Sequence, residues 1–140
     1  LLIGPPGAPL VIEFTDPDCP YCRALDRFWA AKAAEGKPVR RQIYFVSGIH
    51  PEAASKAEHI LCAKDREAAF RATYAGEPPK PLNRCADGAA QVQAHAQAVK
   101  SMGISGTPTL ILDGQLISGL RQAEIEAWLA KKRPSAKPTT

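Results

Sequence analysis

Residues 10–22 read LVIEFTDPDCPYC, and this stretch decides the fold. Its first part, residues 10–15, is a short apolar run that follows the Gly- and Pro-rich segment IGPPGAP, as is typical of a buried strand. It then leads into two cysteines separated by two residues. Apolar residues recur at helical spacing over residues 20–34, and Gly36 ends this run. The stretch therefore predicts a strand that leads directly into a helix with a CxxC pair at its start.

The rest of the chain completes an α/β pattern. Residues 39–47 (VRRQIYFVS) form the second predicted strand, so the first third is a strand, helix, strand unit with a right-handed crossover. A helical insertion follows over about residues 51–103, and Asp65 is predicted to cap its second helix. Its third helix is expected to bury one face made of Ala89, Val92, Ala96 and Val99. A hairpin around Asp113-Gly114 and a final helix give the order β-α-β, helical insertion, β-β-α.

Composition limits what the chain can be. Its 140 residues are 45% hydrophobic and 23% charged, which fits one globular domain and excludes a disordered, collagenous or fibrous chain. The longest apolar runs are far shorter than the ~18 residues that a membrane span requires. No basic leader followed by a long apolar run opens the chain, so we expect that any secretion signal has been removed.

The net charge of +4 does not indicate a nucleic-acid partner. Four bases and no acid fall among residues 131–140, and they account for the whole excess. This end is expected to be a disordered basic tail, because its composition cannot bury enough apolar surface to order itself, although an anionic partner is the alternative. The predicted organisation is an N-terminal extension or linker over residues 1–9, a main domain over residues 10–130, and this tail.

The four cysteines divide into a close pair, Cys19 and Cys22, and two distant residues, Cys62 and Cys85. Four cysteines allow three pairings, but a CxxC at a strand-to-helix junction favours pairing within itself. Cys62 and Cys85 would then pair with each other. A second, structural disulfide predicts an oxidising compartment for the protein.

The close pair has the geometry for reversible oxidation. Cys19 would project beyond the helix start, while Cys22 lies one turn inside and within disulfide reach. Unpaired backbone amides and the helix dipole favour a thiolate at Cys19, the attacking species in disulfide exchange, whereas Asp16 and Asp18 oppose it. Half of a zinc site and an inert disulfide are the alternatives, but zinc usually needs a second close ligand pair and the histidines show no such spacing. We therefore expect no metal and no cofactor.

A second motif, GISGTPT at residues 103–109, places a proline directly before a strand. Together with the CxxC pair it resembles the thioredoxin superfamily, in which a cis-proline loop faces the redox pair and offers backbone groups to an extended substrate. The resemblance implies that Pro108 is cis and that Thr107 contacts the substrate chain. Pro20 and Tyr21, between the two cysteines, are further candidates for substrate contact, with packing on the helix face as the alternative for Tyr21.

Within this superfamily the chain resembles the catalytic domain of the DsbC and DsbG type of periplasmic disulfide isomerases. The similarity rests on FTDPDCPYC, on LCAKDREAAF with the later Cys85, and on GISGTPT. It implies a thioredoxin-like catalytic domain over residues 10–130, a structural disulfide between Cys62 and Cys85, protein substrates that carry thiols or disulfides, a periplasmic location and a membrane redox partner. The dimerisation domain of that family has no counterpart in residues 1–9, so the sequence is either an excised domain or a naturally short homologue, and we expect a monomer for the chain as given.

Glu13 departs from that pattern. The isomerase domains usually have an apolar residue six positions before the first cysteine, whereas thioredoxin and DsbA type proteins resemble this chain in having an acid. Strand alternation puts Glu13 on a covered face. One hypothesis is that burial favours the protonated acid and lets it exchange protons with Cys22; the alternative is a wet strand end where Glu13 pairs with a nearby base. Arg40 and Arg41 are expected to mark the exposed end of the second strand.

Three functional hypotheses follow from these observations. The first is a thiol:disulfide oxidoreductase of the isomerase or reductase type that acts on secreted proteins through Cys19 and Cys22, with a DsbA-like oxidase direction left open. The second is a non-enzymatic chaperone or adaptor that binds unfolded chains. The third is a cytosolic glutaredoxin-like enzyme, which shares CPYC but which the expected disulfide between Cys62 and Cys85 argues against.

Overall fold

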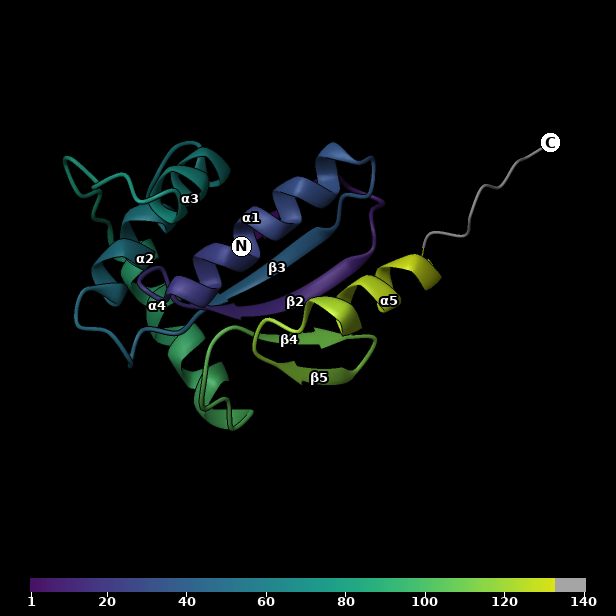
Figure 1. Cartoon of the computed structure of the whole chain (residues 1–140). Helices are drawn as coiled ribbons and strands as arrows, with labels where there is room; N and C mark the ends of the chain where they lie inside the picture. The colour runs from purple at the N-terminus through teal and green to yellow at the C-terminus, as the bar shows by residue number, and fades with distance from the viewer. Residues whose placement is uncertain (133–140) are drawn as a thin grey trace.

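The computed structural model describes residues 1–132 of the chain. Figure 1 shows a twisted sheet with helices packed along it. The strands are β1 (Leu2–Ile3), β2 (Leu10–Thr15), β3 (Arg40–Phe45), β4 (Thr109–Leu112) and β5 (Gln115–Ser118). The helices are α1 (Pro20–Ala34), α2 (Ala53–Leu61), α3 (Arg66–Tyr74), α4 (Ala86–Ser101) and α5 (Gln122–Lys132). Apart from β1, this order is the one that the sequence predicts.

A five-stranded sheet with the order β1-β3-β2-β4-β5 organises the described chain. β2 and β3 run parallel because α1 crosses over between them, whereas the other strand pairs are antiparallel. In Figure 1, α1 and α5 lie along the same side of the sheet, and the helices of the insertion gather near one end of it. The parallel pairing places the carboxyl end of β2, where the chain turns into α1, beside the carboxyl end of β3.

Two apolar clusters form the core. One packs α1 and α5 against the sheet and includes Val11, Leu25, Trp29, Leu110, Ile125 and Leu129. The other joins β3 to the insertion and includes Ile43, Phe45, Ile60, Phe70, Tyr74 and both Cys19 and Cys22. The thiol pair is therefore part of the cluster that the insertion completes, so the inserted helices support the start of α1.

Helix α4 buries the predicted face in part, since Val92 is buried and Ala89, Ala96 and Val99 are half-buried. Its buried residues are Gly88, Val92 and His95, so only Val92 was predicted correctly as fully buried. His95 is held inside because its Nδ1 accepts the backbone N–H of Phe45 at 3.1 Å, which offsets the cost of burying an imidazole. Gly88 lies against the sulfurs of Cys62 and Cys85, where an added Cβ would overlap Cys62 Sγ.

Both ends of the domain differ from the predicted boundaries. Residues 1–9 were expected to be an extension or linker, but Leu2–Ile3 pairs with β3 as an edge strand and buries Ile3. The basic tail was expected from residue 131, but α5 continues through Lys132. Residues 133–140, the rest of that expected tail, lie outside the described residues. Within residues 1–132, no helix combines the length and the apolar character that crossing a membrane requires.

Candidate active site

Cys19 occupies the N-cap position of α1. Its backbone is extended (φ −88°, ψ 122°), its side chain caps no backbone N–H, and Pro20 follows in the first turn. Proline suits this place because its φ is already helical and the N–H it lacks has no partner in a first turn. The Cys19 sulfur therefore lies at the positive end of the helix dipole. Cys19 is 7% exposed, so its sulfur is at the margin of the surface.

Cys22 lies one turn inside the helix and is fully buried. The backbone N–H of Asp16 donates to its sulfur at 3.4 Å. Burial raises the pKa of the Cys22 thiol to about 12, and hydrogen bonds from Asp16, Thr107 and Thr15 offset only part of this rise. Both thiols are free in this structure. The pair is therefore asymmetric, with a peripheral sulfur at a helix start and a buried sulfur that is protonated at neutral pH.

The loop before β4 lies against the first thiol. The Thr107-Pro108 peptide bond is cis, as the resemblance implied, and Cys19 Sγ is 3.7 Å from the carbonyl oxygen of Thr107. The Thr109 hydroxyl donates to the carbonyl of Gly106 at 2.7 Å, which closes the loop on itself. The structure thus brings Thr107 and Pro108 together with the CxxC pair, although they are 88 residues apart in the chain.

The two residues between the cysteines point outward. Pro20 is exposed, and Tyr21 is 67% exposed, so Tyr21 does not pack in the core. A groove with a volume of about 260 Å³ is lined in part by Ile104 and Ser105, which precede Thr107 in the same loop. Val46, Ile49, Val99 and Ile104 contribute its apolar lining. Apolar surface therefore adjoins the cis-proline loop.

The two aspartates before Cys19 are each paired with a cationic or titratable side chain. Asp18 contacts Lys56 and lies 3.5 Å from the guanidinium of Arg23. Asp16 is fully buried, and its Oδ2 is 2.6 Å from Nδ1 of His50. The sequence counted both acids as opposing a thiolate, but Lys56 and Arg23 offset the charge of Asp18, and His50 offsets that of Asp16 when its imidazole is protonated. His50, Lys56 and Arg23 were not predicted, because two of them come from the loop and helix after β3.

Glu13 is buried, which excludes the wet strand end, but it also pairs with a base. Its two oxygens accept from Nε and Nη2 of Arg41, both at 2.9 Å, and Arg41 Nη1 donates to Asp26 at 2.7 Å. Burial by itself would lower the pKa of Arg41, but the charges of Glu13 and Asp26 outweigh it and raise that pKa. The prediction that Arg41 marks an exposed strand end is therefore wrong. The geometry favours Glu13 as an anchor for Arg41 over a proton carrier for Cys22.

Cys62 and Cys85 form a disulfide, as predicted. They cap the carboxyl end of α2 and the amino end of α4, with their Cα atoms 5.8 Å apart. Because these sulfurs are bonded to each other, they are not ligands that could complete a zinc site with Cys19 and Cys22. Among residues 1–132, no group of three or more His, Cys, Asp or Glu side chains could hold a metal ion.

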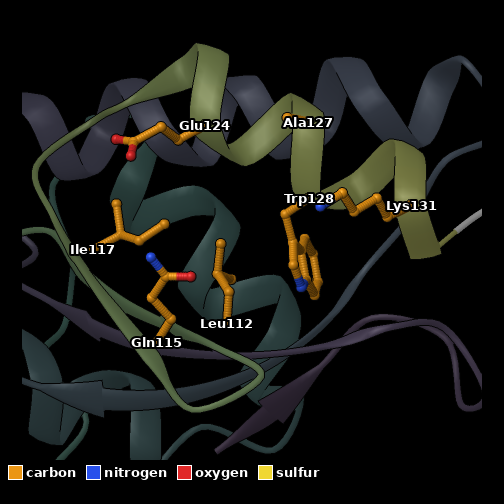
Figure 2. Close-up of a pocket in the computed structure, with 7 residues that line it drawn as sticks. All are labelled: Leu112, Gln115, Ile117, Glu124, Ala127, Trp128 and Lys131. Atoms are coloured by element: carbon orange, nitrogen blue, oxygen red, sulfur yellow. The ribbon is translucent and has the colours of Figure 1, made fainter.

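A separate pocket lies between β5 and α5 (Figure 2). It has a volume of about 240 Å³, and Ile117, Trp128 and Lys131 are among its lining residues. None of the residues predicted for the site lines it. The chemistry suggested by the sequence is therefore concentrated at the start of α1.

Comparison with known sequences gives consistent matches. The family model described as a thioredoxin-like domain matches residues 2–133. The thiol:disulfide interchange protein DsbC of Dickeya dadantii is 32% identical over 130 residues, which are 91% of this chain and 53% of that protein. The chain spans about half the length of the curated relatives it matches.

Solved structures with a similar fold include proteins of thiol-disulfide exchange. The disulfide interchange protein from Neisseria gonorrhoeae superposes with a TM-score of 0.75 at 27% identity, covering 94% of this chain and 95% of that chain. A ScsC structure from Proteus mirabilis superposes with a TM-score of 0.80 at 16% identity, covering 96% of this chain and 73% of that chain. At that identity the second likeness concerns the fold alone.

Proposed function

This chain belongs to the thioredoxin-like family, and we propose that it is a thiol:disulfide oxidoreductase of the isomerase or reductase type. The observation that supports this most is the asymmetric pair of free thiols, with Cys19 beside the Thr107 carbonyl and Cys22 buried behind it. Relatives named thiol:disulfide interchange protein DsbC support the same activity. Cys19 is proposed as the attacking residue and Cys22 as the resolving residue.

In the first step, the Cys19 thiolate attacks one sulfur of a substrate disulfide. A bond forms between Cys19 Sγ and that sulfur, the substrate S–S bond breaks, and the other substrate sulfur leaves as a thiolate that takes a proton from water. The helix start supports this step because it stabilises negative charge on Cys19. Lys56 and Arg23 support it by offsetting the charge of Asp18.

In the second step, Cys22 gives its proton to water and attacks Cys19 Sγ. The mixed disulfide breaks, the substrate sulfur leaves as a thiolate, and the protein gains a Cys19-Cys22 disulfide while the substrate gains two electrons. The raised pKa of Cys22 makes this step slow at neutral pH. A slow second step favours isomerisation, because another substrate thiolate has time to attack the mixed disulfide and leave the pair reduced.

The proposed substrate is an extended segment of a secreted protein that carries a thiol or a disulfide. Its backbone would pair with Thr107 in a short case of strand addition, while Pro20 and Tyr21 contact it from the other side of Cys19. The apolar groove next to the loop suits the apolar side chains of an unfolded chain. Glu13 enters this proposal as the anchor of Arg41, not as a catalytic residue.

We also propose a periplasmic location and a membrane redox partner that keeps the pair reduced. The disulfide between Cys62 and Cys85 supports an oxidising compartment, since such bonds rarely persist in the cytosol. A reduced Cys19-Cys22 pair in that compartment needs an electron donor, because its surroundings oxidise exposed thiols.

Insulin reduction with dithiothreitol as the electron source tests the proposal. The wild-type protein is expected to accelerate precipitation of the insulin B chain, and Cys19→Ser is expected to abolish this. Cys22→Ser should accumulate a covalent adduct with a disulfide substrate, visible on a non-reducing gel and lost on reduction. Equal activity of wild type and Cys19→Ser would refute the proposal. A reduction potential near that of the strong oxidant DsbA would exclude the reductase or isomerase direction.

A further inference from the structure

Asp16 joins the buried thiol to the surface. Its backbone N–H donates to Cys22 Sγ at 3.4 Å. One of its carboxylate oxygens accepts the N–H of Asp18 at 2.8 Å, and the other lies 2.6 Å from Nδ1 of His50. The Asp16 side chain is fully buried, whereas 39% of the His50 side chain is exposed. Asp16 thus contacts the buried Cys22 thiol through its backbone and the partly exposed His50 imidazole through its side chain.

The two acids of this loop have partners of different kinds. Asp18 is paired with Lys56 and Arg23, whose residue types keep their charges through neutral pH. Asp16 is paired with His50, and histidine is the residue type that gains or loses its charge between about pH 5 and 8. The pair formed by Asp16 and His50 is therefore neutral when the imidazole is protonated and negative when it is not.

We propose that His50 is a positioning residue for the thiol pair, which acts through Asp16 in two ways. It holds the Asp16 loop so that the N–H of Asp16 donates to Cys22, and it supplies the counter-charge that keeps a buried carboxylate from opposing thiolate formation beside it. An unpaired negative charge near a sulfur disfavours the thiolate, so a positive charge on His50 favours exchange. The inference rests on the proposed function, since it concerns the reactivity of the same thiols.

The charged and titratable groups around this pair come from three elements. Asp16 and Asp18 lie on the loop between β2 and α1, Cys19, Cys22 and Arg23 lie on or at the start of α1, and Lys56 lies on α2. Glu52, two residues after His50, is exposed. Lys56 and Arg23 pair with Asp18, whereas His50 pairs with Asp16.

The test measures thiol reactivity directly. Iodoacetamide reacts with the fully reduced protein, and the rate of Cys19 labelling is followed by mass spectrometry between pH 5 and 9. In this reaction the Cys19 thiolate displaces iodide and forms a thioether. The variants are His50→Asn, which keeps a hydrogen-bond donor but cannot be charged, and His50→Lys, which carries a permanent charge. His59→Asn is the matched control, because His59 lies on α2 and bonds to Asn83 instead of an acid.

At the acidic end of the range, His50→Asn should be labelled roughly 3- to 30-fold more slowly than wild type, the factor that removal of one nearby charge gives. The ratio of the two rates should fall toward one as rising pH removes the charge of the imidazole. His50→Lys should match wild type at low pH and exceed it at high pH. His59→Asn should follow wild type throughout.

Three results would overturn the inference. The first is a rate ratio between wild type and His50→Asn that stays at one across the pH range. The second is a constant loss at every pH without rescue by lysine, which would indicate a structural role only. The third is the same pH-dependent loss in His59→Asn, which would indicate a general effect of charge. Labelling needs no turnover, so failure of wild type in insulin reduction would refute the proposed function separately.

Discussion

Removing the disulfide between Cys62 and Cys85 should lower stability by an amount that the structure allows to be worked out. The bond closes a loop across 23 positions. In the chain-entropy model, closing a loop of that length stabilises the fold by about 3 kcal/mol. Given the unfolding entropy expected for a domain of this size, the Cys62→Ala/Cys85→Ala variant should melt roughly 10 °C lower. Insulin reduction below the melting temperature should be unaffected, since Cys19 and Cys22 are untouched.

Gly88 offers an internal control for this argument. Alanine normally stabilises a helix relative to glycine by about 1 kcal/mol, but a Cβ at Gly88 would overlap Cys62 Sγ and lie 3.0 Å from Cys85 Sγ. Gly88→Ala should therefore destabilise wild type and cost at least about 1 kcal/mol less in the Cys62→Ala/Cys85→Ala variant. Urea titrations of the four proteins measure this coupling. A loss of less than about 3 °C without the disulfide, or an equal cost of Gly88→Ala in both backgrounds, would refute the reasoning.

Three further outcomes are expected for buried charged and titratable groups. Arg41→Met should lower the free energy of unfolding by about 3 to 5 kcal/mol, and adding Glu13→Gln should recover part of it; equal stability of the single and double variants in urea would contradict this. Burial lowers the pKa of His95 to about 4, below the ~6.5 of an unfolded chain. Between about pH 6.5 and pH 4 the unfolded state therefore binds a proton that the folded state does not, so the free energy of unfolding should fall by up to about 3 kcal/mol as the pH drops through this interval. Urea titrations of His95→Asn should show a weaker dependence of the free energy of unfolding on pH. Because the pKa of Cys22 is about 12, iodoacetamide at pH 7 should label it in Cys19→Ser at least roughly 100-fold more slowly than in the same protein unfolded in urea.

The sequence predicted the parts of the fold that depend on local signals. The spacing of apolar residues and the glycines that end helical runs predicted α1 and the order of the later elements. Asp65 was predicted as a helix cap, and it is the N-cap of α3. β1 was missed because a strand of two residues carries no period, and only its pairing with β3 defines it. The CxxC pair and its place at a helix start were also predicted, because both depend on neighbouring residues alone. The cis bond at Pro108 came from family resemblance.

The parts that the sequence missed are pairings between distant segments. Arg41 lies between Arg40 and Gln42 and shares a strand face with Val39, Ile43 and Phe45, but an arginine near a strand end is by itself compatible with an exposed or a buried side chain. Its burial is stable because Glu13 and Asp26, from β2 and α1, supply two carboxylates. His95 is buried for a similar reason, since the acceptor it provides is used by the backbone of β3. Periodicity cannot predict these positions, because the partner that offsets the cost of burial is unknown until the chain is folded.

The same limit applies to the reactivity of the thiols, and it changes which residues control it. In the sequence, Asp16 and Asp18 lie just before Cys19, and no lysine or arginine lies among residues 16–22. In the structure, Lys56 and Arg23 pair with Asp18, and His50 pairs with Asp16. The loop after β3 and helix α2 contribute two of these three partners, and they belong to or adjoin the insertion. Substitution of Pro20 and Tyr21 would leave the pairs of Asp18 with Lys56 and Arg23 and of Asp16 with His50 in place, because neither residue takes part in them. The charged and titratable partners of the two acids therefore lie outside the tetrapeptide, on α1, in the loop after β3 and on α2.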